Sequence, residues 1–100
     1  MVKHVVMWKL KDFAEGAAKK ENALKIKASL EGLQSKIKEV KYLEVGISVS
    51  DAADFYDLVL ISEFNESKDL ESYRKHPEHV KAAEFIGKVQ PERKVVDYNI

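Results

Sequence analysis

An α+β fold, in which a four-stranded antiparallel sheet carries two helices on one face, is predicted for this chain of 100 residues by three observations. Alternating patterns typical of β-strands occur at residues 3–11, 41–49, 55–64 and 94–100. Helical periodicity occurs between the first and second of these segments and between the third and fourth. The resulting order of strand, helix, strand, strand, helix, strand is that of the split β-α-β arrangement.

The first predicted strand is apolar on both faces. One face carries His4, Val6, Trp8 and Leu10. The other face carries Val5 and Met7 between lysines. Because neither face is polar along its whole length, we expect this strand to be covered on both sides.

The first helix is predicted from apolar residues that recur at spacings of three and four. These residues are Ile26, Leu30, Leu33, Ile37 and Val40. The pattern predicts one amphipathic helix that begins at about Ala17 and continues to Val40, with a lysine-rich face in solvent. Gly32 lies inside this helix, where a glycine costs about 1 kcal/mol relative to alanine.

The second and third strands are predicted to form an antiparallel pair. Apolar residues alternate with polar ones along 41–49, as they do in an edge strand. Residues 50–54 have the composition of a turn, and the segment 55–64 that follows is rich in aromatic and branched residues. Both faces of this third strand are apolar, so it too is expected to be covered twice.

The second helical region is predicted to break at a proline. Asn65-Glu66-Ser67 can cap its start. Pro77 has no backbone N–H and cannot continue a regular helix, but it suits the first turn of a new one. We therefore expect a break near His76 and a second helical segment from Pro77 to about Lys88.

An exposed apolar surface is expected on the sheet face that the helices leave bare. Val5, Met7, Val59 and Ile61 would lie on this face. A contiguous apolar patch of a few hundred Å² is unusual on a monomer. A second copy of the chain, packed sheet against sheet about a two-fold axis, would cover it. We therefore predict a homodimer with these four residues in its interface.

Composition and charge exclude several classes of partner. The 17 basic and 17 acidic residues cancel, so neither nucleic acid nor an anionic membrane is an expected partner. The absence of cysteine removes disulfides and thiolate metal sites. There is no charged-then-apolar leader and no run of about 18 apolar residues. A cytoplasmic protein with a single domain over residues 1–100 is expected.

The chemistry of the sequence is concentrated in Tyr73-Arg74-Lys75-His76-Pro77-Glu78-His79, which holds two of the 3 histidines. With Met1-Val2-Lys3-His4-Val5-Val6 at the start and Val95-Val96-Asp97-Tyr98 at the end, this stretch resembles the stress-responsive dimeric α/β barrel (Dabb) family. The resemblance runs from end to end and implies a ferredoxin-like subunit whose sheet pairs with that of a second copy into a barrel. More distantly, the chain is similar to olivetolic acid cyclase-type polyketide cyclases.

The resemblance to these cyclases implies a catalytic pair, Tyr73 and His79, with His4 in the same pocket between sheet and helices. A histidine near its reference pKa of about 6.5 can remove a proton from carbon, and a phenol can donate a hydrogen bond to the resulting enolate. The break at Pro77 would turn both side chains of the pair into one cavity. The pocket is expected to be lined by Val6, Trp8, His76 and Ala83.

Each candidate also has a structural interpretation. His76 before a proline can cap the new helix, whereas His4 and Tyr73 can be hydrogen-bonded members of the core. Residues 14–40 contain no aromatic side chain, so the long polyketide pocket of the cyclases is not expected here. Pro77 disturbs the helical spacing of the two nearby histidines, so neither a metal site nor any other cofactor is expected.

Three functions remain open at this point. The first is a cofactor-free, cyclase- or lyase-like enzyme that uses His79 as base and Tyr73 as hydrogen-bond donor on a small carbonyl compound. The second is a dimer that binds a small or hydrophobic ligand, or protects against stress, without turnover. The third, implied by the wider dimeric α/β barrel group, is a cofactor-independent monooxygenase.

Overall fold

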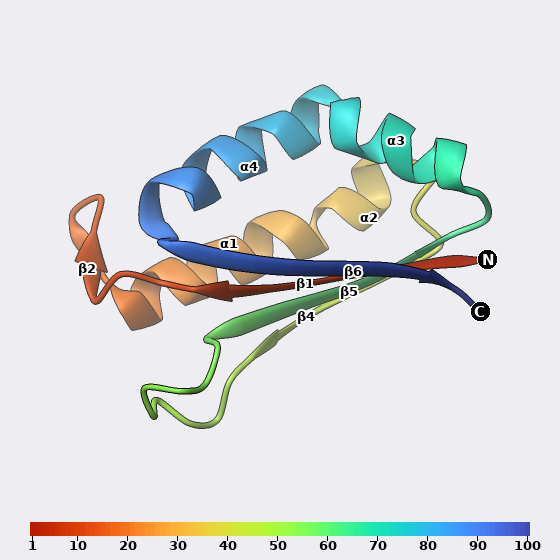
Figure 1. Ribbon diagram of the computed structural model, residues 1–100. Coiled ribbons are helices and arrows are strands. Elements are labelled where there is room, and N and C mark those ends of the chain that lie inside the picture. Colours follow the sequence, from red (N-terminus) through yellow and green to blue (C-terminus); the bar gives the residue numbers. More distant parts are fainter.

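A computed structural model describes residues 1–100 and contains one four-stranded sheet covered by helices (Figure 1). The strands are β1 (Val2–Lys9), β4 (Tyr42–Ile47), β5 (Leu58–Phe64) and β6 (Glu92–Asn99), with β2 (Phe13–Ala14) and β3 (Ala17–Ala18) as a separate short hairpin. The helices are α1 (Lys19–Glu31), α2 (Leu33–Lys36), α3 (Ser67–Lys75) and α4 (Pro77–Val89). The predicted α+β fold is confirmed.

The main sheet has the strand order β4-β5-β1-β6, and every neighbouring pair is antiparallel. The central strand β1 pairs His4 with Ser62 of β5 on one side and with Asp97 of β6 on the other. Residues that lie opposite each other in antiparallel strands share a face of the sheet. His4, Ser62 and Asp97 therefore lie on one face.

All four helices lie against this same face, which we call the inner face (Figure 1). The first strand turns His4, Val6 and Trp8 inward, as the alternation predicts, and all three are buried. The helices contribute Ile26, Leu30, Tyr73 and Ile86, among others, to a core of 20 buried apolar residues. The site described below is therefore enclosed between the sheet and the helix layer.

The first helix differs from the prediction at its start. The chain first forms the β2–β3 hairpin, and α1 begins only at Lys19. Glu15 and Gly16, at the tip of the hairpin, both have positive φ angles, 50° and 77°, a conformation that favours glycine at the second position. The buried Asn22 donates hydrogen bonds from Nδ2 to the carbonyls of Ala14 and Ala17, which ties the hairpin to the helix.

The first helix also ends earlier than predicted. Gly32 closes α1 by donating its backbone N–H to the carbonyl of Ala28, and the short helix α2 follows. The backbone becomes extended at Ile37. Ile37 and Val40 are nevertheless buried, because the chain beyond α2 continues along the core. The apolar spacing thus identified core residues correctly but overestimated the length of the helix.

The connection between β4 and β5 is longer than the predicted turn, because β5 begins at Leu58 rather than at 55. The side chain of Asp57 accepts a hydrogen bond from the backbone N–H of Leu10, and its own N–H donates to the carbonyl of Trp8. These bonds hold Asp57 beside the end of β1, and β5 begins at the next residue. Phe55, predicted to lie within the strand, is exposed in the loop.

The predicted break at the proline is present. α3 ends at Lys75, His76 has an extended conformation, and Pro77 occupies the first turn of α4. Glu66 occupies the N-cap position of α3, but its side chain makes no capping hydrogen bond. Polar side chains at 65–67 were therefore a correct signal for the helix start, although no capping bond forms.

The outer face of the sheet carries no helix (Figure 1). Val5, Val59 and Ile61 are half-buried there, and Met7 is 38% exposed. On the edge strand β6, Val96 on the same face is 54% exposed. The outer face is thus an apolar surface open to a partner. No helix of the chain is both long enough and apolar enough to cross a membrane.

Candidate active site

A cavity of ≈ 100 Å³ lies between the inner face of the sheet and the helices α1 and α4. Its lining residues are His4, Val6, Trp8, Leu30, Leu60, His79, Ala83, Ile86, Gly87, Gln90 and Arg93. Val6, Trp8 and Ala83, three of the residues expected to line a pocket, are among them, and so are two of the three histidines. The polar groups of the cavity come from β1, β6, α4 and the residue just after α4, so only the folded chain brings them together.

His76 does not line this cavity, contrary to the prediction. Its ring nitrogen Nδ1 accepts a hydrogen bond of 3.1 Å from the backbone N–H of Glu78, so it caps the N-terminus of α4. The proline that follows it fixes the start of the helix, and the bond to Glu78 keeps the ring of His76 at the end of that helix. His76 therefore has the structural role that the sequence allowed for it, a cap of the new helix.

His4 is held by a carboxylate. Its side chain is buried, with a residue exposure of 3%, and its Nδ1 lies 2.5 Å from Oδ1 of Asp97 on the neighbouring strand. The other oxygen of Asp97 accepts a hydrogen bond of 2.9 Å from the guanidinium of Arg74, which also pairs with Glu71. This network connects β1 and β6 to α3 and fixes the orientation of the His4 ring, as second partners of a histidine commonly do.

The electrostatic effects within this network oppose one another. Burial lowers the pKa of His4 below its ordinary value, and the hydrogen bond that its ring donates to Asp97 only partly offsets this. For Asp97, burial acts to raise the pKa, but the hydrogen bonds and charges of His4 and Arg74 together outweigh it and lower the pKa. At neutral pH the network therefore holds a carboxylate beside an uncharged imidazole.

His79 is held by a backbone carbonyl. Its Nδ1 lies 3.1 Å from the carbonyl oxygen of Arg74 in the last turn of α3. A carbonyl oxygen can only accept, so Nδ1 carries the proton and Nε2 has the free lone pair. Burial lowers the pKa of His79, and the hydrogen bond to the carbonyl of Arg74 opposes this only in part. The charges of Arg74 and Arg93, and that of His4 when it is protonated, lower the pKa further. His79 therefore presents a neutral, unprotonated nitrogen near neutral pH.

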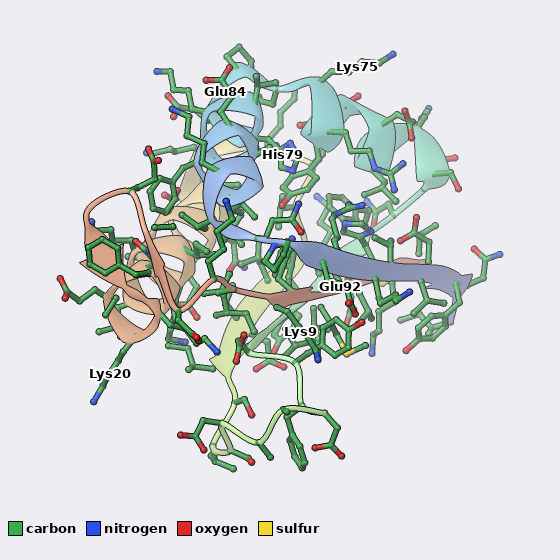
Figure 2. All side chains as sticks on the ribbon, turned by 60° about the vertical axis from the view of Figure 1, so that its left-hand side comes forward. Lys9, Lys20, Lys75, His79, Glu84 and Glu92 are labelled. Atoms are coloured by element: carbon green, nitrogen blue, oxygen red, sulfur yellow. The ribbon has the colours of Figure 1, made fainter.

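The corner between α3 and α4 places His79 on the inside of the molecule. Figure 2 shows its ring within the angle between the two helices, whereas Lys75 and Glu84 point outward. Tyr73 precedes His79 by six residues, a separation that would leave two side chains on different faces of an unbroken helix. With the break at Pro77, their ring centroids are only 4.5 Å apart.

Tyr73 is fully buried behind His79 instead of lining the cavity itself. Its ring packs against Phe64 at 5.1 Å and stands edge-on to His4 at 6.4 Å. Burial raises the pKa of Tyr73 to about 12, so its hydroxyl stays protonated. That hydroxyl has no hydrogen-bond partner in the protein. A buried, unpaired donor is uncommon and calls for an explanation such as a bound water or ligand.

Four polar residues of this site were not predicted: Arg74, Gln90, Arg93 and Asp97. The alternation of side chains along the last strand could have identified two of them. Val96 and Tyr98 lie on the outer face, so the odd-numbered Arg93 and Asp97 lie on the inner face. Nothing in the sequence placed Gln90, which lies just after the end of α4. No group of three or more His, Cys, Asp or Glu side chains that could hold a metal ion occurs in the chain.

The side chains at this cavity can themselves donate and accept protons. Two neutral imidazoles border one small, largely apolar cavity, each fixed at Nδ1 by an acceptor. A general base works best when its pKa lies near the operating pH and its orientation is fixed. A protonated phenol stands directly behind one of them. Such a set of groups is typical of acid–base chemistry on a small molecule.

Comparison with known proteins gives one family and several similar structures. The family model described as "Stress responsive A/B Barrel Domain" matches residues 2–100. A dimeric protein of unknown function and ferredoxin-like fold from Bacteroides fragilis is 30% identical, with a TM-score of 0.84, and the alignment covers 99% of this chain and 95% of that one. No protein with a curated description matches the chain.

Two enzymes share the fold at lower identity. A hydroxynitrile lyase from Passiflora edulis is 22% identical, with a TM-score of 0.80 and coverage of 99% of this chain and 92% of the lyase. An antibiotic biosynthesis monooxygenase is 14% identical, with a TM-score of 0.73 and coverage of 100% and 98%. At these identities the similarity concerns the fold alone, so the chemistry has to be argued from the site itself.

Proposed function

The chain belongs to the stress responsive A/B barrel domain (Dabb) family, and we propose that it is a homodimeric, cofactor-free acid–base enzyme acting on a small carbonyl compound. The observation that carries this proposal is the geometry of His79. Its Nδ1 is engaged by the carbonyl of Arg74, so the unprotonated Nε2 is the nitrogen available to a ligand in the cavity. His79 is the proposed base.

The proposed step is the removal of a proton from the carbon next to a carbonyl group. The C–H bond breaks, the proton goes to Nε2 of His79, and the electron pair of that bond becomes an enolate whose charge is mostly on oxygen. The hydroxyl of Tyr73, which is protonated and has no partner, is buried behind His79 and does not line the cavity. As the proposed donor, it reaches that oxygen only when the ring of His79 shifts to admit the substrate. The enolate can then form or break a bond at carbon, as a cyclase or a lyase requires.

His4 is the proposed second acid–base group of the cavity. The Asp97 carboxylate orients its ring and stabilises the imidazolium that forms when it takes up a proton. Because His4 and His79 border the same cavity, one can remove a proton while the other returns one. Arg74 holds Asp97 in place and is a positioning residue rather than a catalytic one.

The size of the cavity limits the substrate. Its volume of ≈ 100 Å³ is smaller than a cavity of roughly 150 Å³ that holds benzene. The reacting part of the substrate is therefore at most a few non-hydrogen atoms, which excludes a polyketide chain. The hydroxynitrile lyase from Passiflora edulis is an example of a lyase on this fold.

The homodimer is proposed from the outer face of the sheet. Val5, Met7, Val59 and Ile61 form an apolar surface there that no element of the chain covers. Structures with the same fold from Bacteroides fragilis, Thermobifida fusca and Jannaschia are described as dimeric. Packing two such sheets face to face buries apolar area on both copies, which favours association.

The proposal is tested by hydrogen exchange, which needs no knowledge of the later steps. Pyruvate, hydroxypyruvate and dihydroxyacetone are each incubated with the protein in D₂O, and loss of the signal of the protons next to the carbonyl is followed by NMR. We expect exchange above the buffer rate, reduced about 100-fold or more in His79→Asn. His76→Asn is the matched control, because it removes a histidine from the same corner while asparagine preserves the helix cap.

The outcomes separate enzyme from binding module. Exchange that His79→Asn abolishes and His76→Asn leaves unchanged supports the proposed base. If no probe exchanges faster than in buffer, or if the two variants are equally active, the acid–base proposal is wrong. A protein that binds the probes without exchange would be a ligand-binding dimer, the second function that the sequence left open.

A further inference from the structure

An unpaired, solvent-exposed positive charge borders the cavity. Arg93 of β6 lines the cavity, and its position opposite the buried Trp8 places its side chain on the inner face. The chain has only one other arginine, Arg74, which pairs with two carboxylates. Arg93 forms no ion pair and no side-chain hydrogen bond, although a guanidinium is well suited to bind a carboxylate through two parallel bonds.

The charge of Arg93 acts on both histidines of the cavity. Arg93 lines the same cavity as both rings, and its charge contributes to lowering the pKa of His4 and of His79. No carboxylate among the lining residues opposes it, and Asp97 directs its two oxygens to His4 and Arg74. An anion bound at Arg93 would therefore meet attraction without a competing negative group.

Gln90 adds an unpaired acceptor to the same cavity. Its side-chain oxygen Oε1 is buried and has no hydrogen-bond partner, whereas its backbone N–H is fixed to the carbonyl of Ile86 at the end of α4. Gln90 and Arg93 are separated by the short connection between α4 and β6. A buried acceptor that lacks a donor favours a ligand that supplies one.

We propose that the ligand of this cavity is a short hydroxy acid that also has a keto group, with its carboxylate paired to Arg93 and its hydroxyl donating to Oε1 of Gln90. This inference rests on the proposed function, because the carbonyl group on which His79 acts belongs to the same molecule. A phosphate ester fits less well, since Arg93 is the only lining side chain that is permanently cationic. Because Arg93 is exposed to solvent, the carboxylate need not occupy the cavity of ≈ 100 Å³, which then holds only the carbonyl and hydroxyl part of the molecule.

Three small molecules test the contact with Arg93 and the contact with Gln90 separately. Hydroxypyruvate has a carboxylate, a carbonyl and a hydroxyl, dihydroxyacetone lacks the carboxylate, and pyruvate lacks the hydroxyl. Dissociation constants are measured by NMR titration of the protein. We expect hydroxypyruvate to bind about tenfold or more tightly than dihydroxyacetone, because a charge-assisted pair is lost, and about threefold to tenfold more tightly than pyruvate.

Variants assign each preference to its residue. Arg93→Gln should abolish the preference for hydroxypyruvate over dihydroxyacetone, whereas Arg93→Lys should keep part of it. Lys20→Gln is the matched control, because it makes the same charge change on an exposed lysine distant from the cavity (Figure 2). Gln90→Met, which has a similar shape but no acceptor oxygen of that kind, should remove the preference for hydroxypyruvate over pyruvate.

The outcomes distinguish this inference from the proposed function. Equal binding of hydroxypyruvate and dihydroxyacetone, or a charge preference that survives in folded Arg93→Gln, overturns the hydroxy-acid assignment even if His79-dependent exchange is observed. Binding that depends on Arg93 and Gln90 without any exchange supports the assignment and overturns the enzyme. Should Arg93→Gln fail to fold, two other results still contradict the inference. One is an undiminished preference for hydroxypyruvate over dihydroxyacetone in Arg93→Lys, and the other is an unchanged preference for hydroxypyruvate over pyruvate in Gln90→Met.

Discussion

The two faces of the sheet are made by the same strands but have opposite properties. Leu60 and Ile61 are consecutive residues of β5, yet Leu60 is 2% exposed under the helices whereas Ile61 lies on the face that no helix covers. The inner face also holds buried polar side chains, His4 and Ser62, each with a hydrogen bond. On the outer face, the middle of the central strands presents Val5, Met7, Val59 and Ile61 instead, with the Lys3–Glu63 ion pair beside them.

This difference indicates two separate tasks. Buried polar groups cost free energy unless they are paired, so a chain that needed only a core would have no advantage in placing an imidazole network beneath its helices. Apolar surface costs free energy while it remains in water, so the outer face gains most from a partner. The inner face is therefore suited to chemistry and the outer face to association.

The largest effect is expected from the inner face. Leu60→Ala removes a fully packed side chain and leaves a space beside the cavity, so the free energy of unfolding should fall by about 2–5 kcal/mol. Urea unfolding followed by circular dichroism measures it. Val49→Ala, at a fully exposed position in the loop after β4, serves as the control and should change stability by less than about 0.5 kcal/mol. Equal effects of the two substitutions would contradict the assignment of Leu60 to the core.

A substitution on the outer face should change the dissociation constant of the dimer. Ile61→Asp places a carboxylate within the apolar surface and brings it near its own copy across the two-fold axis, so the dissociation constant of the dimer should rise about 100-fold or more. Sedimentation velocity over a range of concentrations measures this change. Lys75→Asp, on the exposed side of α3 (Figure 2), should leave the dimer unchanged. A dimer that persists in Ile61→Asp would exclude this face as the interface.

A substitution in the His4–Asp97–Arg74 network should have an intermediate effect on the free energy of unfolding. Asp97→Asn keeps the shape of the side chain but removes the charge that binds both His4 and Arg74. We expect a loss of about 1–3 kcal/mol in the free energy of unfolding, because hydrogen bonds to a charged group are replaced by neutral ones. An unaltered unfolding curve would mean that solvent screens the network.

The pH dependence of stability has a definite sign. The pKa values of His4 and His79 are lowered by burial from 6.5, so below that pH the unfolded chain binds more protons than the folded one. The stability that the neutral histidines contribute is present above about pH 6.5 and is lost as the pH falls below it toward their folded pKa values. Urea unfolding between pH 8 and pH 5 should show this loss, and the double variant His4→Asn, His79→Asn should show a flatter profile. A steeper loss in the variant would contradict the cause.

The smallest effect on stability is expected for Tyr73→Phe. The hydroxyl of Tyr73 has no partner, so its removal costs no protein hydrogen bond and should change the free energy of unfolding by less than about 0.5 kcal/mol, or raise it slightly. The exchange reaction should nevertheless slow, because the proposed donor to the enolate is lost. A large loss of stability would show that the hydroxyl is bound to an ordered water that serves the fold.

The sequence by itself determined which residues face inward along β1, where the helical layer breaks and which apolar residues form the core. These features are local, because alternation, helical spacing and the missing N–H of Pro77 act within a few residues of one another. The resemblance carried by the residues around Tyr73 and His79 added the family, which the match over residues 2–100 confirms.

Only the tertiary structure decided which polar groups meet. His4 and Asp97 are 93 residues apart in the chain, and their contact depends on the register between β1 and β6. The positions of Gln90 and Arg93 at the cavity depend likewise on how the end of α4 returns to the sheet. Sequence periodicity reports whether a side chain is covered, but a hydrogen bond between distant segments requires that their backbones be placed to within a fraction of an ångström, which only the packed sheet and helices achieve.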